Sequence, residues 1–257
     1  MFDISELLEL SKLAAVRAAA CISGTSEDMR SYEYAELQPR EVKAAADSVL
    51  ETEILNHLSP LGLTILSEEA GLIHGKNHPE YRFIIDPLDG TFNYVKQLGP
   101  SAVSIALWRE ETPVFGVLSL LPQGTLIWGG PDIGAFRDGA PILVSATEDY
   151  SRASVCTGFP VRFDINSDSE RERFWITTEG FAKVRMIGSA ATSLANVACG
   201  FAAAYVEYGI MLWDVAAGLS IVKGAGGAFC ITPGLTENSL KDAAGNPQLH
   251  RACSVNL

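Results

Sequence analysis

Residues 84–94 read IIDPLDGTFNY, an apolar run that stops at acidic and turn-forming residues. The apolar residues 83–85 are typical of a buried strand, and Pro87 and Gly90 prevent that strand from continuing. Two aspartates lie where the strand ends. The pattern therefore predicts a strand whose carboxyl end carries acidic side chains.

Asp86 and Asp89 are three residues apart around a proline, so a turn brings both carboxylates to one side of the chain. Two like charges so close repel each other, and a divalent cation between them removes the repulsion. The pair therefore predicts a site for a hard metal ion. The alternative is that D-P-x-D-G forms only a turn, in which Asp and Gly are common.

Gly90 and Thr91 indicate a second feature, because a strand that ends in D-G-T can open a helix whose free N–H groups face outward. Such a terminus binds phosphate through its backbone donors and the helix dipole. Thr91 also offers a hydroxyl that can orient a water beside the metal. Metal and phosphate are thus predicted to share one place.

Two further acidic positions adjoin apolar segments. LTILSEEAG places Glu68 and Glu69 directly after a predicted strand, and GIMLWDVAAG places Asp214 at the start of an apolar helix. Each has a structural alternative, since Glu68 can be a solvated loop residue and Asp214 can be a helix N-cap.

The composition is that of an acidic globular protein. The chain has 257 residues, of which 47% are apolar, and this supplies core for one large domain or two small ones. With 19 Lys+Arg against 31 Asp+Glu, the net charge is −12. This charge repels a phosphate backbone, so direct nucleic-acid binding is not expected. A small anionic substrate would need cations to bridge it.

The N-terminal segment is expected to form an ordinary helix rather than a signal peptide, because it lacks a basic start and carries acidic residues. No 18 uncharged apolar residues run together, so no membrane span is expected. Five widely spaced cysteines favour reduced thiols in the cytoplasm. The expected buried stripe of the helix is Leu7, Leu10, Ala14, Arg17 and Cys21, with Leu13 and Ala20 beside it.

The order of elements predicts α+β layers. A second helix is expected over residues 41–57, buried at Ala45, Val49, Ile54 and Leu58. Short apolar runs then predict an antiparallel meander: LTIL, RFII, VSIALW, PVFGVLSLL, GTLIWGG and GAFRDG. Helices are expected over residues 169–178, 190–199 and 213–224, with strands near VRMI, AAAYVEY and GAFCIT. A candidate boundary at residues 145–154 divides the chain into halves of residues 1–150 and 151–257.

The segments LSEEAG, IIDPLDGTFNYV and LWDVAAG, in this order and at these separations, resemble the signature of the inositol monophosphatase family of lithium-sensitive, magnesium-dependent phosphomonoesterases. Supporting stretches are FGVLSLLPQGTLIWGGPDIGAFRDGAPILVS, TGFPVRFD, RMIGSAATSLANVACGFAAAYVEYGI and IVKGAGG, so the similarity spans about residues 40–230. The resemblance implies the layered αβαβα sandwich of that family.

The resemblance also assigns roles to residues. It implies two or three Mg²⁺ ions, with Asp47 and Thr91 supporting the nucleophilic water and the weaker metal. The implied catalytic residues are Asp47, Thr91 and Glu68. The implied metal ligands are Glu68, Asp86, Asp89, Asp214 and the main-chain carbonyl of Leu88. The implied substrate contacts are Gly90 and Thr91 for phosphate, a turn of Gly188, Ser189 and Ala190, and Glu207 for substrate hydroxyls.

The implied reaction is direct in-line attack of a metal-activated water on a phosphate monoester, without a phosphoenzyme. Inositol 1-phosphate is the leading substrate, because NYV after D-G-T and Glu207 before G-I-x-x-W-D resemble the inositol branch. Alternatives are a 3′-phosphoadenosine 5′-phosphate, fructose 1,6-bisphosphate or histidinol phosphate phosphatase. A homodimer, a cytoplasmic location and lithium inhibition are also implied. A different class of function is a protein of this fold that contacts the transcription or translation machinery.

Some features differ from the family pattern. Before Asp47 the chain reads EVKAAAD where the family usually has an Asp-x-Val-Thr-type stretch, which leaves support for a third ion open. Phe92 stands where a smaller residue is common and predicts a narrower pocket. The chain ends at ACSVNL, and the usual closing helix is expected to be missing.

Other motifs are given structural interpretations. His74 and His78 have a zinc-like spacing, but Gly75, Asn77 and Pro79 favour an exposed loop. The GAGG run at residues 224–227 is interpreted as a helix stop. The four tryptophans are scattered, and core packing accounts for most of them. Lys96 either flanks the phosphate or is solvated.

Overall fold

The structure is a computed structural model that describes residues 3–22, 27–34, 42–159, 164, 166–234, 236–247 and 249. The C-terminal ACSVNL, and with it the expectation about a closing helix, lies outside the described residues. None of the described helices is both long enough and apolar enough to cross a membrane.

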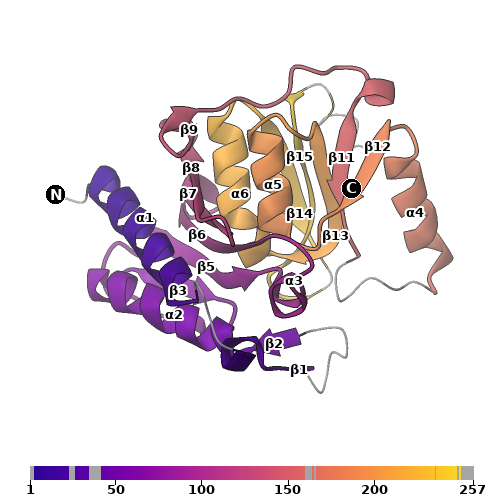
Figure 1. Ribbon diagram of the computed structural model, residues 1–257. Helices are drawn as coiled ribbons and strands as arrows, with labels where there is room; N and C mark the ends of the chain where they lie inside the picture. Colours follow the sequence, from indigo (N-terminus) through magenta and orange to yellow (C-terminus); the bar gives the residue numbers. More distant parts are fainter. Residues whose placement is uncertain are drawn as a thin grey trace.

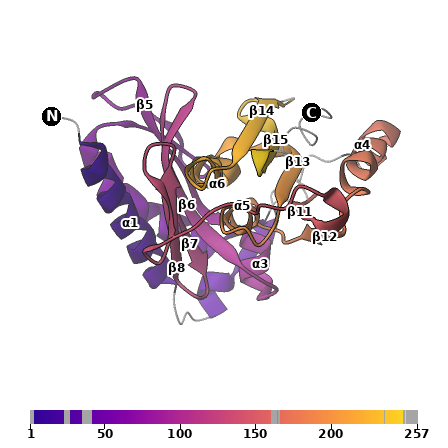
Figure 2. The same ribbon diagram turned by 90° about the horizontal axis from the view of Figure 1, so that it is seen from above.

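Layers of helix and sheet alternate across the molecule, as Figure 2 shows from above. The outer helices α1 (Ile4–Cys21) and α2 (Ala45–Leu58) cover an eight-stranded sheet, and α5 (Ala190–Ala198) and α6 (Leu212–Gly224) lie between that sheet and a five-stranded one. Helix α4 (Asp168–Thr178) lies beyond the second sheet (Figure 1). This order confirms the predicted layered α+β fold.

The large sheet has the strand order β10-β9-β8-β7-β6-β5-β3-β4. From β5 to β9 it is the predicted antiparallel meander, and the short β10, which was not predicted, extends it antiparallel to β9. The strand at LTIL was wrongly included in that meander, because it pairs parallel to β5. The chain returns through β4 and a loop before β5 begins. The bounds are β3 Thr64–Ser67, β4 Gly71–Ile73, β5 Tyr81–Asp89, β6 Ser101–Arg109, β7 Thr112–Leu121, β8 Thr125–Gly130, β9 Gly134–Arg137 and β10 Ala140–Pro141.

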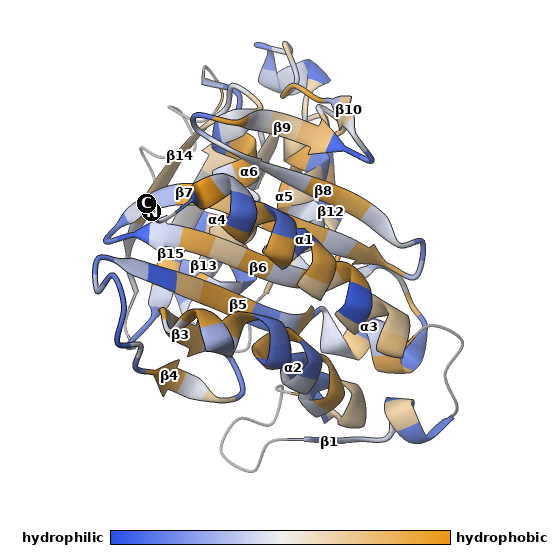
Figure 3. Ribbon diagram, turned by 90° about the vertical axis from the view of Figure 1, so that its left-hand side faces the viewer, coloured by the Kyte–Doolittle hydropathy of each residue, from blue (hydrophilic) through white to orange (hydrophobic). Residues whose placement is uncertain are grey.

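Alternate residues of the central strands face opposite layers. Phe83 and Ile85 of β5 pack under α1 and α2, whereas Ile84 between them packs toward α5 and α6. Figure 3 shows α1 and α2 lying across the first of these faces. The period of two therefore gives this sheet an apolar core on both sides.

The predicted buried stripes of the first two helices were partly wrong. Leu13, Arg17, Ala20 and Cys21 are exposed, because helix α1 places its small residues against the sheet and so approaches it closely. In α2, which begins four residues later than predicted, Ala45 is exposed. The buried positions of α1 are Leu7, Leu8, Ser11, Ala14, Ala15, Ala18 and Ala19, and those of α2 are Ala46, Asp47, Leu50, Ile54 and Leu58.

The second sheet has the order β12-β11-β13-β15-β14. The strands expected near VRMI, AAAYVEY and GAFCIT are confirmed as β12 (Lys183–Met186), β13 (Ala204–Met211) and β14 (Ala228–Pro233). The prediction missed β11 (Ser154–Thr157) and β15 (Ser239–Gly245). The chain crosses from the large sheet to this one between β10 and β11.

Helix α6 lies very close to the large sheet at Gly116. A Cβ atom added at Gly116 of β7 would lie 2.1 Å from the carbonyl oxygen of Ala217 in α6. The absence of a side chain at this position therefore sets how deeply α6, and the acidic residue near its start, sits against the sheet.

Candidate metal and phosphate site

Three acidic side chains from different elements meet beside the carboxyl ends of β3 and β5. Glu68 directly follows β3, Asp86 lies in β5, and Asp214 is the third residue of α6. Because β3 and β5 are parallel, their carboxyl ends lie at one edge of the sheet, and the Glu68 N–H donates to the Ile85 carbonyl oxygen at 3.1 Å. One oxygen from each of the three carboxylates lies within 4.8 Å of the others.

The two oxygens of Asp86 differ in their hydrogen bonding. Its Oδ1 accepts a hydrogen bond from the Leu88 N–H at 2.9 Å, whereas its Oδ2 has no hydrogen-bond partner in the described part of the chain. Oxygens on opposite sides of a bound Mg²⁺ lie about 4 Å apart, close to the separation within this group. The donor set, three carboxylates with one unsatisfied oxygen, therefore fits a hard divalent cation.

Burial and mutual repulsion disfavour the charged forms of these groups. Burial is the main cause that raises the pKa of Glu68 to about 8, with Asp47, Glu69 and Asp89 adding repulsion. Burial and then the charge of Glu68 raise the pKa values of Asp86 and Asp214 well above their ordinary range. A cation in the group reverses this preference, since it stabilises the carboxylates that the protein interior destabilises.

Asp89 is held differently from the other predicted ligands. Both of its oxygens face the N-terminus of α5, where the Ser189 hydroxyl donates to it, as do the N–H groups of Ala190 at 3.2 Å and Ala191 at 2.9 Å. Burial outweighs these hydrogen bonds and raises the pKa of Asp89 to about 6. Asp89 is therefore next to the group of three carboxylates but is not part of it.

Asp47 and Thr91 adjoin the same site. The Asp47 carboxylate accepts from the Ala44 N–H at 2.6 Å in the first turn of α2. The Thr91 hydroxyl, at the start of helix α3 (Thr91–Lys96), lies 3.0 Å from the Leu88 carbonyl oxygen and 3.4 Å from Asp47 Oδ1. Burial, with repulsion from Glu69, raises the pKa of Asp47 to about 7.

A cavity of about 290 Å³ opens beside these groups. Glu68, Asp89 and Phe92 line it, and Phe92 itself is 44% exposed. The structure brings all the sequence-predicted substrate contacts to its wall: Gly90, Thr91, Gly188, Ser189, Ala190 and Glu207.

Glu207 is a buried residue in the wall of this cavity. The Tyr205 hydroxyl donates to its Oε2 at 3.0 Å, and burial raises its pKa to about 7. Gly158 allows the backbone to approach it, because a Cβ there would lie 2.8 Å from Glu207 Oε1.

Gly90 connects the two parts of the site. Its φ of +84° is a left-handed conformation that favours glycine, and an added Cβ would lie 3.0 Å from the Cβ of Ser189. The D-G-T turn therefore lies directly against the Gly188–Ala190 turn, although about a hundred residues separate them.

The sequence did not predict several of the residues that line the cavity. Thr157 ends β11, and Gly158 and Phe159 follow it. Because this strand was not predicted, no role was assigned to the TGFP segment, although its similarity was noted. The others are Val42, Ser193 and Ile210, whose types carry no signal of a site.

The remaining motifs lie where their structural interpretations place them. His74 and His78 are exposed in the loop between β4 and β5, and α6 ends at Gly224 as the GAGG run predicts. The Lys96 ammonium group donates to the Tyr32 hydroxyl of strand β1 (Tyr32–Tyr34). Among the tryptophans, Trp108 is fully buried whereas Trp175 is 64% exposed.

Comparison with known proteins adds independent evidence. A family model described as the inositol monophosphatase family matches residues 3–250. The fructose-1,6-bisphosphatase/inositol-1-monophosphatase of Aquifex aeolicus is 30% identical, covering 97% of this chain and 94% of that protein. A chloroplastic phosphatase of Arabidopsis thaliana is 34% identical over 87% of this chain, which spans only 62% of that protein's length.

Two bacterial relatives carry a different name. The Nus factor SuhB of Escherichia coli is 29% identical, covering 98% of this chain and 95% of that protein. The crystal structure of the extragenic suppressor protein suhB from Bartonella henselae superposes with a TM-score of 0.85 at 26% identity, covering 98% of each chain. The family match over nearly the whole chain, the shared fold and the acidic site together show that this chain belongs to the inositol monophosphatase family.

Proposed function

We propose that this chain is a magnesium-dependent phosphatase of small polyol monophosphates, with inositol 1-phosphate as the leading substrate. One observation carries the proposal: Glu68, Asp86 and Asp214 place oxygens within 4.8 Å of one another, and a buried Asp86 oxygen has no hydrogen-bond partner among the described residues. The family is one of phosphatases, and the names of its relatives support hydrolysis of a phosphate ester.

Magnesium would be held by Glu68, Asp86 and Asp214, with Asp89 and the Leu88 carbonyl beside them, and Asp47 supporting a weaker ion. Bound ions of this kind activate water and offset the charge of the phosphate and the leaving oxygen. The protein itself has a net charge of −12, so this positive charge is needed for an anionic substrate to approach the site.

Thr91 is proposed to orient the attacking water. Its hydroxyl lies between the Asp47 carboxylate and the Leu88 carbonyl, and both are acceptors. When the hydroxyl donates to one of them, its lone pairs are available to accept a hydrogen bond from a water. Asp47, with a pKa near 7, provides a nearby base at neutral pH.

The substrate is proposed to lie in the 290 Å³ cavity, with its phosphate on the backbone N–H groups of Gly90 and Thr91. The Glu207 carboxylate and the turn at Gly188–Ala190 would contact substrate hydroxyls. The described lining residues of this cavity include no lysine or arginine, so a second phosphate would have no cationic partner there. This composition supports a monophosphate over fructose 1,6-bisphosphate or 3′-phosphoadenosine 5′-phosphate.

The experiment is a measurement of phosphate release from inositol 1-phosphate, histidinol phosphate and the two bisphosphates, each with magnesium and with EDTA. Fastest turnover of inositol 1-phosphate, inhibited by lithium and by EDTA, is expected. Asp86→Asn removes the activity, and Glu9→Gln, an exposed charge change on α1, does not. If none of the four compounds is hydrolysed, the proposal is contradicted.

We also propose that the protein is a homodimer and is located in the cytoplasm. The four cysteines in the described part of the chain are free thiols, which supports a reducing compartment. Sedimentation of the purified chain tests the dimer.

A second candidate function is an interaction role with the transcription or translation machinery, favoured by the name of the Escherichia coli relative. Asp89→Asn separates the two functions. If the variant loses phosphatase activity but keeps its cellular role, then that role does not depend on catalysis.

A further inference from the structure

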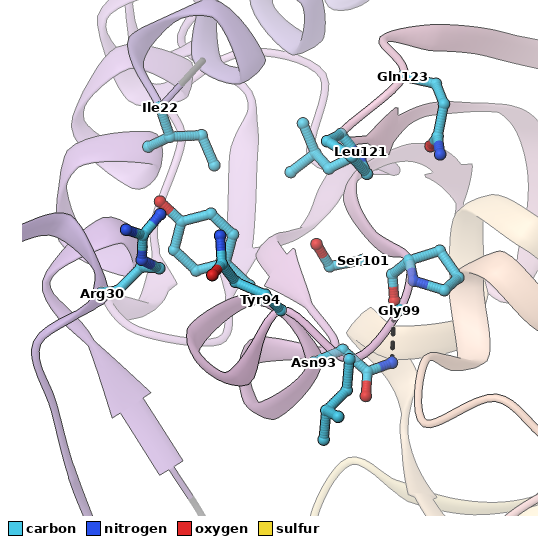
Figure 4. A pocket seen from close by; sticks show the side chains of 12 residues that line it. Ile22, Arg30, Asn93, Tyr94, Gly99, Ser101, Leu121 and Gln123 are labelled. Atoms are coloured by element: carbon cyan, nitrogen blue, oxygen red, sulfur yellow. Dashed lines mark hydrogen bonds between the residues drawn. The ribbon is translucent and has the colours of Figure 1, made fainter. Parts of the chain in front are cut away.

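A second, larger cavity, with a volume of about 620 Å³, borders α3 at Asn93 and Tyr94. Its wall is formed by the short helix η1 (Glu27–Arg30), the end of α3, the start of β6 and the end of β7 (Figure 4). In the described part of the chain, no residue lines both this cavity and the cavity beside the acidic site. It is therefore a separate candidate for ligand binding, and its volume is typical of small-molecule sites.

Arg30 is the charged residue of this cavity. Every other described lining residue is uncharged, in a protein whose net charge is −12. The Arg30 guanidinium is partly buried and makes no hydrogen bond or ion pair with any described residue. Burying part of a cation without an anionic partner is unfavourable, so this guanidinium is available to an external anion.

The rest of the wall suits an organic molecule rather than a bare ion. In Figure 4 the Arg30 side chain lies beside the Tyr94 ring, and Leu121 and Gln123 lie across the cavity from them. Ile22 and Leu121 provide apolar contact area, while Gln123 provides amide groups for hydrogen bonding. This mixture of one charged, a few polar and several apolar groups is the usual lining of a ligand site.

The wall is already held in place. The Asn93 amide donates to the carbonyl oxygens of Pro100 at 2.9 Å and Ile187 at 2.7 Å, and the Leu98 N–H donates to the Asn93 carbonyl oxygen at 3.0 Å. These bonds fix the segment from the end of α3 to β6. A cavity fixed in this way loses little entropy when a ligand binds.

We propose that this cavity binds a small organic anion, with its carboxylate or phosphate-like group on Arg30 and a ring or apolar body between Tyr94 and Leu121. The site does not depend on the proposed phosphatase function, because it shares no lining residue with the acidic site in the described part of the chain. Its ligand needs no metal, since the cation is supplied by the protein.

Calorimetric titration of the full-length protein with benzoate tests the proposal, once in EDTA and once with magnesium. Benzoate combines a ring with one carboxylate and has no phosphate group to hydrolyse. We expect the same affinity under both conditions, within about twofold, because the acidic site takes no part. Benzyl alcohol, which has a similar ring but no charge, should bind at least about tenfold more weakly.

Substitutions of Arg30 test whether this residue binds benzoate. Arg30→Gln should weaken benzoate binding at least about tenfold, and Arg30→Lys, which keeps the charge but not the planar fork, should be intermediate. Arg17→Gln is the matched control, since Arg17 is an exposed arginine on α1, and it should bind as the natural protein does. Absence of benzoate binding to the natural protein, or equal binding by folded Arg30→Gln, overturns the proposal.

Discussion

Glu68, Asp86 and Asp214 illustrate a conflict between stability and function at the scale of single residues. Asp86 is buried, Glu68 and Asp214 beside it are partly buried, and desolvation together with repulsion raises the pKa of all three. A protein selected only for stability would avoid such a group, because buried like charges are costly. A divalent cation that binds here relieves the repulsion, and this relief contributes to the affinity for the cation.

Asp214→Asn is predicted to remove magnesium binding without unfolding the protein. The asparagine oxygen can still accept the hydrogen bond from the Met211 N–H, which is 3.1 Å long in the natural protein, and one repulsive charge disappears. Thermal melting with and without magnesium measures the effect. At a magnesium concentration of about 100 Kd the natural protein should gain about 5–10 °C, and the variant should gain almost nothing.

The control for this variant is Asp132→Asn, because Asp132 is an exposed acid far from the site in sequence and its substitution changes the net charge equally. It should keep the full gain in melting temperature. A gain in Asp214→Asn as large as in the natural protein would remove Asp214 from the proposed ligands.

Single residues were predictable from the sequence where local chemistry defines them. Asp86 and Asp214 gave signals of their own, because each adjoins an apolar segment at an element boundary. No local sequence signal predicts that Asp89 docks onto α5. Ser189 lies a hundred residues away, and its contact with Asp89 depends on the packing of α5. Arg30 was not singled out either, because a lone arginine in a polar stretch carries no pattern.

At the scale of elements, the approach of α6 to the large sheet positions Asp214. Gly116→Ala is predicted to destabilise the protein by about 3 kcal/mol, because its Cβ would overlap the Ala217 carbonyl group 2.1 Å away and push α6 outward. The same displacement moves Asp214 relative to Asp86, so magnesium affinity should fall as well. Urea denaturation and magnesium titration measure the two effects.

Gly180→Ala is the matched control for this prediction. Among the described residues, no atom lies within 4 Å of a Cβ added at Gly180, and its φ is not in the left-handed region. Its stability should change by less than about 1 kcal/mol, in the direction of a gain. If Gly116→Ala is tolerated equally well, then the close contact between α6 and β7 does not hold.

Elements with a strong apolar period were predictable, and those decided by tertiary contacts were not. The strands β5 to β9 are apolar runs bounded by Gly and Pro, and they were found. Strand β15 has the sequence SLKDAAG, which lacks such a run, and it exists because it pairs with both β13 and β14. The face of α1 was misassigned because its small residues, rather than its leucines alone, contact the sheet.

At the scale of the whole molecule, the raised carboxyl pKa values predict how stability depends on pH. In the folded protein without metal these values are about 8 for Glu68, 7 for Asp47 and Glu207, and 6 for Asp89, against ordinary values of 4.5 for Glu and 3.8 for Asp. The folded state therefore binds more protons than the unfolded state between about pH 4 and pH 8. Its free energy of unfolding falls as the pH rises through this window.

Urea denaturation at pH 5 and pH 8 checks this dependence. In EDTA the protein should be less stable at pH 8 than at pH 5. Magnesium should restore stability mainly at pH 8, where the carboxylates are ionised and able to bind it. Greater stability at pH 8 than at pH 5 in EDTA would show that the acidic residues are not buried together as described.

The location of a bound divalent ion shows whether Glu68, Asp86 and Asp214 together hold a metal. Mn²⁺ is an oxygen-preferring substitute for Mg²⁺, and its anomalous scattering locates it in a crystal. We expect a manganese peak within about 2.6 Å of carboxylate oxygens from Glu68, Asp86 and Asp214. At saturating manganese, a crystal with no peak among these three side chains would contradict this expectation.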